Sequence, residues 1–200
     1  MITKEAYVVA GTNDYRGYKI DIEYDNDPAN PREWDNFGTM ICLHGRYSLG
    51  DVQALDNQDL RTWTDIHEYI EKDLGGVIIL PLHLYDHSGI SIKVGSYRGL
   101  TPHYGWDTGQ VGYIYCTQAD IDVAGIDMAK AEEILLAEIN TYDRYLTGQV
   151  YTYKVIKEST CESCNHTSEN FEDSVSGWES AEIAMQEAMQ VVDYLNGDRH

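Results

Sequence analysis

The sequence predicts an α+β fold, with a mainly antiparallel β-sheet backed by two or three helices and an acidic C-terminal helical segment. Two observations support this prediction. Segments that alternate apolar and polar residues, as strands with one buried face do, outnumber segments with helical spacing. The two kinds of segment do not alternate regularly along the chain, so we expect mainly antiparallel strand pairing.

Strand-like segments account for most of the expected sheet. Residues 18–24 (YKIDIEY) alternate with a period of two, and residues 77–85 (VIILPLHLY) are almost continuously apolar. Pro81 indicates an edge or a bulge in the second of these, because proline cannot donate to a strand ladder. The turn at 86–89 (DHSG) then leads into residues 90–94, which predicts a hairpin with a polar tip. The other expected strands are residues 39–44, 110–117 and 150–156.

Three segments show helical spacing. Residues 57–74 place Ile66 and Ile70 on one face, and a Gly-Gly pair follows them. Residues 127–146 give the clearest helical pattern, and a glycine closes it two positions later. Residues 178–195 carry an apolar stripe, so we expect this last helix to pack on the rest of the protein.

A change of composition after Lys157 suggests a domain boundary. We expect residues 1–157 to form an α+β core domain. Residues 158–200 contain ten acidic residues and one basic residue, Arg199. They are expected to form an acidic loop with a Cys-x-x-Cys pair and a C-terminal helix that docks on the core.

Negative charge is the most extreme property of the chain. Asp and Glu total 34 against 14 Lys and Arg, which gives a formal net charge of −20. Such a field repels phosphate backbones, and the basic residues are scattered singly, so direct nucleic-acid binding is not expected. The same field attracts basic protein surfaces. Acidity alone does not separate a surface that imitates nucleic acid from an adaptation to solubility or high salt.

The N-terminal residues lack the apolar run of a signal peptide, and no stretch of the sequence reaches the length of a membrane span. We therefore expect a cytoplasmic protein that does not contact membranes. Without an export signal, free thiols or a metal site are favoured over disulfides. The cysteines concerned are Cys42, Cys116, Cys161 and Cys164.

The Cys-x-x-Cys pair in the tail resembles half of a zinc knuckle. Its candidate ligands are Cys161, Cys164 and His166. A closed zinc site needs four ligands, and no second cysteine pair follows in the sequence. The sequence therefore predicts no cofactor, with zinc at these residues as the alternative.

A nearly neutral stretch between residues 77 and 117 could form a pocket. Two His and one Asp can hold a catalytic metal, although the turn-forming tendency of Asp-His-Ser-Gly explains the same residues. This stretch gives the alternative function, a small-ligand-binding protein or a metal-dependent hydrolase. Its candidate residues are His83, Asp86, His87, Ser88, Trp106 and Asp107.

Common catalytic signatures do not occur in the sequence. It contains no Gly-x-Ser-x-Gly nucleophile elbow, no P-loop and no dinucleotide-binding glycine motif. We assign no catalytic residues, and the sequence favours a non-enzyme without excluding an enzyme.

Four long motifs carry a resemblance to a known family. They are residues 31–51 (PREWDNFGTMICLHGRYSLGD), 79–90 (ILPLHLYDHSGI), 106–117 (WDTGQVGYIYCT) and 138–151 (EINTYDRYLTGQVY). In this order they resemble a family of uncharacterised proteins encoded by phages, plasmids and other mobile elements of bacteria and archaea. The resemblance covers most of residues 15–157 and implies a mobile-element accessory protein. Small acidic proteins of this kind are often inhibitors of host defence.

The tail departs from that family at one position. In relatives the Cys-x-x-Cys pair is followed by an Asp-Ser-Cys type of segment. The corresponding residues 173–178 read DSVSGW here, so the third cysteine is absent.

Charge, motif content and resemblance together predict a non-enzymatic protein that binds and inhibits a host protein. The specific form expected is an anti-restriction or anti-CRISPR type of nucleic-acid mimic, and the partner a nucleic-acid-handling defence enzyme in the host cytoplasm. A homo-oligomer is also compatible with the sequence. The expected acidic face consists of Glu132, Glu133, Glu138, Glu179, Glu182 and Glu187.

Overall fold

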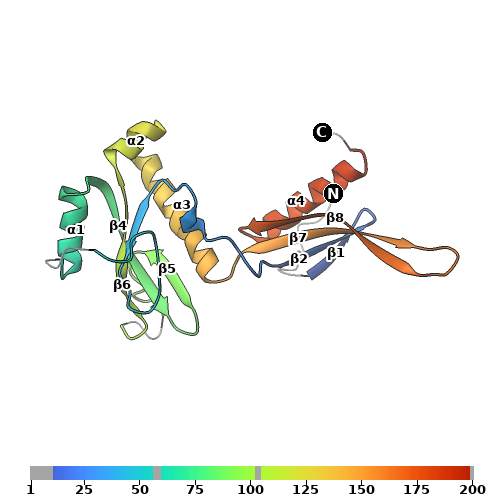
Figure 1. The fold of residues 1–200 in the computed structure, drawn as a ribbon, viewed down its shortest axis with the longest axis horizontal. Helices are drawn as coiled ribbons and strands as arrows, with labels where there is room; N and C mark the ends of the chain where they lie inside the picture. The colour runs from blue at the N-terminus through green and yellow to red at the C-terminus, as the bar shows by residue number, and fades with distance from the viewer. Residues whose placement is uncertain (1–10, 56–59, 102–104, 199–200) are drawn as a thin grey trace. The chain divides into compact units, whose positions relative to one another are not determined.

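The computed structural model describes residues 11–55, 60–101 and 105–198. These residues form two antiparallel four-stranded sheets and four α-helices, which confirms the α+β class (Figure 1). Among them, no helix is both long enough and apolar enough to cross a bilayer.

The chain divides into two compact units, and each has its own sheet. Residues 30–147 form the larger unit, whereas residues 1–29 and 148–200 together form the smaller unit. This division differs from the boundary expected after Lys157, which falls inside a strand of the smaller unit. The expected single sheet is therefore two separate sheets.

The sheet of the larger unit has the strand order β3–β6–β4–β5, with antiparallel neighbours throughout. The predicted hairpin is present, because Asp86 at the end of β4 pairs with Ile90 at the start of β5. Pro81 lies in β4 opposite Tyr113, and the register shifts just beyond it, at Leu82 and His83. The strands are β3 (Thr39–Cys42), β4 (Gly76–Asp86), β5 (Ile90–Val94) and β6 (Thr108–Thr117).

Helices cover both faces of this sheet (Figure 1). α3 (Met128–Leu146) packs on one face and buries Leu135 and Ile139 among the side chains of the strands. α1 (Trp63–Lys72) packs on the opposite face through Ile66 and Ile70. The larger unit is thus a three-layer arrangement of helix, sheet and helix.

Capping residues set the helix starts. Thr62 and Asp65 form a capping box, so α1 begins at Trp63, and residues 57–59 of the expected helix lie outside the described residues. Asp127, expected as the first residue of the helix 127–146, is instead the N-cap of α3 and accepts a hydrogen bond from the backbone N–H of Lys130. A second capping box, at Thr117, begins the short helix α2 (Gln118–Ala124), which the sequence analysis missed. A 3₁₀ turn, η1 (Pro31–Glu33), precedes β3.

The sheet of the smaller unit has the strand order β1–β2–β7–β8, again antiparallel. α4 (Ala181–Leu195) packs on it and buries Ala184, Met185 and Val192 against residues of β2 and β7. The expected acidic loop is wrong in part, because residues 167–178 form a strand that pairs with β7. The strands are β1 (Gly11–Tyr15), β2 (Tyr18–Tyr24), β7 (Tyr151–Thr160) and β8 (Thr167–Trp178).

The contact between β3 and β6 gives a test of the fold of the larger unit. A Cβ atom at Gly112 would lie 1.8 Å from the backbone oxygen of Ile41, whereas one at Gly109 on the same strand would meet no atom within 4 Å. We expect Gly112→Ala to lower the free energy of unfolding by about 3 kcal/mol or more, because the neighbouring backbone cannot move aside. The matched variant Gly109→Ala should change it by less than about 0.5 kcal/mol. Urea denaturation midpoints measure both, and equal midpoints would contradict the β3–β6 register.

Candidate functional site

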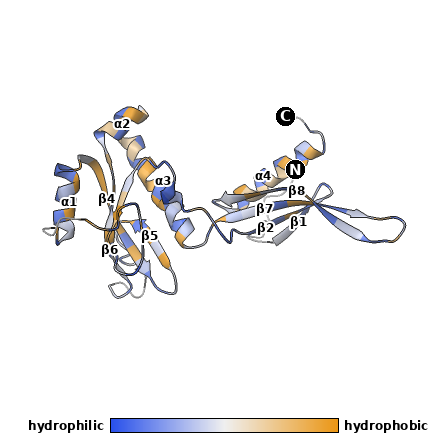
Figure 2. Cartoon of the chain, in the orientation of Figure 1, coloured by the Kyte–Doolittle hydropathy of each residue, from blue (hydrophilic) through white to orange (hydrophobic). Residues whose placement is uncertain are grey.

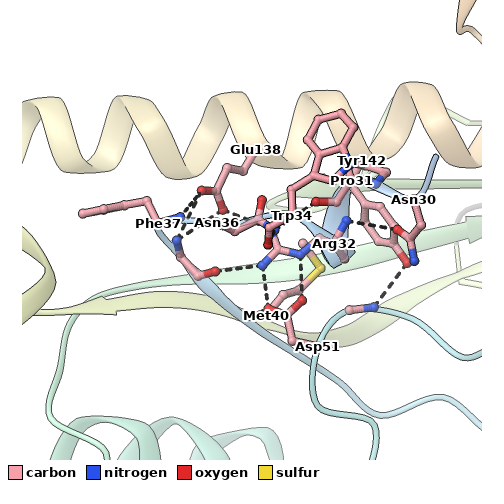
Figure 3. Close-up of polar contacts among 12 residues, drawn as sticks. Asn30, Pro31, Arg32, Trp34, Asn36, Phe37, Met40, Asp51, Glu138 and Tyr142 are labelled. Carbon is pink, nitrogen blue, oxygen red and sulfur yellow. Dashed lines mark hydrogen bonds and ion pairs between the residues drawn. The ribbon is translucent and has the colours of Figure 1, made fainter. Parts of the chain in front are cut away.

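A buried ion network is the most extensive polar cluster among the described residues of the larger unit (Figure 3). The side chain of Arg32 is only 2% exposed and lies between two carboxylates. Its Nε and Nη2 donate to the two oxygens of Asp51 at 2.8 and 2.5 Å, and its Nη1 donates to Glu138 at 3.0 Å. Nη2 also donates to the backbone oxygen of Gly38 at 2.7 Å.

The carboxylates of this network are themselves hydrogen-bonded by the backbone. Glu138 Oε1 accepts from the N–H of Phe37 at 2.7 Å, and Asp51 Oδ2 accepts from the N–H of Met40 at 2.7 Å. Burial alone would lower the pKa of Arg32, but the hydrogen bonds and charges of the two carboxylates outweigh burial and raise it. The guanidinium is therefore held in its charged form by these two carboxylates.

This network changes the interpretation of Glu138. The sequence analysis assigned Glu138 to an exposed acidic face, but its side chain is 14% exposed and points at Arg32 (Figure 3). Leu135 and Ile139 lie on the side of α3 that packs on the sheet. Glu138 is three residues after Leu135, which places it on the same side of the helix, so its side chain is directed inwards. It is a structural ion-pair partner and is unsuited to a contact with another protein.

The remaining glutamates of the expected acidic face lie on two different units. Glu132 and Glu133 are exposed on α3, where Glu133 forms an ion pair with Lys130 at 2.9 Å. Glu179 and Glu182 are exposed at the start of α4, and Glu187 is half-buried on the same helix. The residues of the expected face are therefore divided between the two units.

The larger unit also has a polar pocket of about 400 Å³. It lies where β4 ends, next to the loops that follow β3 and precede β6. Three of the predicted pocket residues line it, namely Asp86, Trp106 and Asp107, and Trp106 is 93% exposed. The full lining is His44, Arg46, Leu84, Asp86, Trp106, Asp107, Thr108 and Gly109.

Ion pairs and hydrogen bonds fix the charged groups of this pocket. Arg46 forms an ion pair with Asp86, which also accepts from the hydroxyl of Tyr47 at 3.1 Å. The Nδ1 atom of His44 accepts from the backbone N–H of Arg46 and of Tyr47, both at 3.2 Å, so this nitrogen carries no proton. The sequence analysis did not single out His44 and Arg46, although both belong to the quoted motif 31–51.

The other predicted pocket residues do not line the cavity. His83 alternates with the pocket-lining Leu84 and so points to the opposite face of the sheet, where its Nδ1 is buried without a hydrogen-bond partner. Burial and the nearby charge of Lys93 lower the pKa of His83, which favours its neutral form. Ser88 has a φ of +59° and serves the tight turn between β4 and β5.

His87 lies beside the pocket. Its Nδ1 is 2.9 Å from the carboxylate of Asp107, and the contact joins the β4–β5 turn to the loop before β6. His87 is thus connected to a pocket residue without facing the cavity.

The Cys-x-x-Cys pair lies at the turn between β7 and β8, and both thiols are exposed. Across residues 11–55, 60–101 and 105–198, no three His, Cys, Asp or Glu side chains converge as metal ligands. The structure does not bring Cys161, Cys164 and His166 together as a three-ligand set. Cys42 and Cys116 are buried in the core of the larger unit, and burial raises the pKa of Cys42 to about 12.

Comparisons with known proteins do not add a function. No family model matches the chain, and neither the curated proteins nor the solved structures give a significant match. The resemblance to mobile-element proteins therefore stays an expectation from the sequence motifs.

Removing Arg32 tests the buried network. We expect Arg32→Ala to lower the free energy of unfolding by about 3 kcal/mol, because it leaves the largely buried Glu138 without its ionic partner and takes the partner of the more exposed Asp51 as well. Lys72→Ala is the matched control, since it breaks the exposed i,i+4 pair with Glu68 and should cost less than about 1 kcal/mol. Chemical denaturation of both variants measures the difference. A loss no larger than that of the control would show that Arg32 is not the organising residue of this unit.

Proposed function

We propose that this protein is a non-catalytic binding protein that engages a basic surface of a partner protein through acidic surface on its smaller unit. In the specific form proposed, it is a mobile-element protein that inhibits a nucleic-acid-handling defence enzyme in the host cytoplasm. Such enzymes carry basic surfaces for phosphate backbones, and exposed carboxylates can compete for them. The resemblance supports the mobile-element part of the proposal.

The proposal rests on the excess of acidic over basic residues in the smaller unit. Its sequence has 16 acidic residues and six basic ones. Of its basic residues, Lys4 and Arg199 lie outside the described residues. Arg16, Lys19 and Lys154 form ion pairs within the unit, and Lys157 lies over the ring of Tyr18. All four described cations are thus already engaged, and carboxylates remain in excess.

This excess is exposed on α4 and on the β7–β8 strand pair. α4 packs its apolar side on the sheet, so Glu182 is left exposed on its other side. Along the strand pair, Glu162, Glu169 and Glu172 are all exposed. Figure 2 shows this strand pair as mostly hydrophilic or neutral. A surface of this kind attracts cations at long range.

One pair of residues shows that placing many acidic residues on β7 and β8 destabilises this strand pair. Glu158 and Glu169 lie directly opposite each other on β7 and β8. Like charges in this position destabilise a strand pair by a few tenths of a kcal/mol to about 1 kcal/mol. Lys19 offsets part of this cost through its 2.5 Å ion pair with Glu158. The acidic character of the strand pair therefore does not serve its own stability.

Two variants of equal charge test the proposal. Glu169→Gln/Glu172→Gln/Glu182→Gln removes three charges from the smaller unit, and Glu71→Gln/Glu132→Gln/Glu133→Gln removes three exposed charges from the larger unit. The partner is first captured from a host lysate at low and moderate salt and identified by mass spectrometry. Titrations with that partner should then show an affinity that falls with salt, because exposed charges are screened.

We expect the smaller-unit variant to lose about tenfold or more in affinity and the larger-unit variant less than about threefold. Equal losses in both would assign the effect to net charge alone. Binding that is insensitive to salt would contradict recognition by charge.

The pocket supports a second candidate function, the binding of a small polar ligand. Trp106 presents a large exposed ring beside the carboxylates of Asp86 and Asp107. This combination suits a neutral sugar, because a sugar stacks its apolar face on an aromatic ring and donates its hydroxyls to carboxylates. Metal-dependent hydrolysis at this site stays a prediction.

A titration with neutral mono- and disaccharides, followed by NMR, tests the pocket. We expect the indole signal of Trp106 to shift on binding and Trp106→Ala to abolish the effect. Trp34→Ala is the control, since Trp34 is also largely exposed but does not line the pocket. If no saccharide moves the Trp106 signal, the sugar-binding function is wrong.

A further inference from the structure

The outer part of the β7–β8 hairpin is an exposed arm. We define the arm as residues 157–172, every one of which is exposed. α4 packs on the inner part of β7, at Tyr151, Tyr153 and Val155, and the arm continues beyond the helix (Figure 1). The arm therefore takes no part in the hydrophobic core of its unit.

Backbone pairing and small polar contacts hold the arm together. Its strands are in register from Lys157 to Thr160, and the hydroxyls of Ser159 and Ser168 lie 2.8 Å apart. Four residues at about 3.3 Å each place the turn roughly 13 Å beyond the start of the arm. A two-stranded hairpin without a packed face is only marginally stable, so the arm gains little for the fold. Its effect is to present the turn to solvent.

The turn at the tip brings two thiols into one small loop. The N–H of Cys161 donates to the oxygen of His166, and the N–H of Asn165 donates to the oxygen of Cys161, both at 2.8 Å. These bonds close the loop, and Asn165 adopts a φ of +53° to complete it. The sequence from Cys161 to Cys164 thus folds back on itself.

Hydrogen bonds converge on the sulfur of Cys161. The hydroxyl of Ser163 lies 3.0 Å from it, and the backbone N–H groups of Ser163 and Cys164 also donate to it. These hydrogen bonds lower the pKa of Cys161 to about 7. The bond from the Ser163 side chain has the largest effect, and a bond from the Cys164 side chain lowers the pKa further. These hydrogen bonds hold the sulfur in place, as hydrogen bonds around a metal site hold its ligands in place.

Two thiols are half of a zinc site. Zn²⁺ in structural sites binds four ligands in a tetrahedron, with thiolates among the preferred ones. The part of the chain that the structure describes offers no third ligand to the tip. A site built on these thiols needs two further ligands from outside the described residues.

We propose that the arm joins two copies of this chain through one zinc ion, which is bound by Cys161 and Cys164 of each copy. Two-fold symmetry supplies the two zinc ligands that one tip lacks, because a second tip carries the same two thiolates as the first. Every residue of the arm is exposed, so two tips meet without unpacking either protein. Each thiol that binds zinc gives its proton to the buffer.

Charge makes this association dependent on the metal. Each arm carries Glu158, Glu162, Glu169 and Glu172 and a single cation, Lys157. Two metal-free arms therefore repel each other, whereas Zn²⁺ supplies positive charge at the point where they meet. Added salt should strengthen the zinc-bridged dimer, because it screens the repulsion between the arms. Binding to a basic partner would show the opposite dependence, so the two proposals fail independently.

The test uses the full chain, reduced and freed of metal, with ZnCl₂ added in steps. Light scattering after size exclusion should show the 22.7 kDa monomer without metal and twice that mass with it. Zinc should saturate at half an equivalent per chain, and a chelator should restore the monomer. Cobalt in place of zinc should give the intense visible absorption of tetrahedral thiolate coordination.

Single substitutions identify the side chains that bind the zinc ion. Cys161→Ser and Cys164→Ser should each lose about 100-fold or more in zinc affinity together with the dimer, while the buried Cys42 and Cys116 remain as an internal control. His166→Ala should keep both. The circular dichroism of all three should match the parent, because the substituted side chains are exposed. One zinc per monomer, a dimer that survives chelation, zinc-independent behaviour, or loss of the site in His166→Ala would each overturn the proposal.

Discussion

The guanidinium of Arg32 joins three parts of the larger unit that are far apart in the sequence: the segment around η1, the loop that contains Asp51, and α3. A charged group in the interior costs several kcal/mol of desolvation unless all its donors find acceptors. Arg32 makes four hydrogen bonds to two carboxylates and a carbonyl, and backbone N–H groups bind the carboxylates in turn. Because these bonds are directional, the network fixes where α3 lies relative to the start of β3, which hydrophobic packing alone would leave less specified.

This network links two of the four sequence motifs. The motif 31–51 supplies Arg32 and Asp51, and the motif 138–151 begins with Glu138. Charged residues of these two motifs thus meet in the ion network around the buried Arg32. The polar pocket is lined by residues of the other two motifs and by His44 and Arg46 of the first, so the motifs hold both the ion network and the candidate ligand site of the larger unit.

Local patterns predicted the single elements well and their arrangement poorly. The β4–β5 hairpin and the helix that ends at Leu146 follow from local patterns, which act over a few residues. The pairing of β2 with β7 joins segments about 130 residues apart, and a period of two shows which face is buried without naming the neighbouring strand. β8 was missed because its residues are polar on both faces. Glu138 was misplaced although its helical spacing from Leu135 and Tyr142 already indicated the inner side of α3.

The net charge hides a difference between the two units. The larger unit has 18 acidic and eight basic residues, so both units have an excess of ten negative charges. In the larger unit many carboxylates have structural roles: Asp51 and Glu138 bind Arg32, Asp65 and Asp120 belong to capping boxes, and Asp143 accepts from the backbone of β5. In the smaller unit the described cations are all engaged, and carboxylates on the arm stay exposed and oppose one another. The exposed carboxylates of the arm do not stabilise the fold, and the arm has no hydrophobic core. The arm is therefore the part of the described structure best suited to a contact with another molecule.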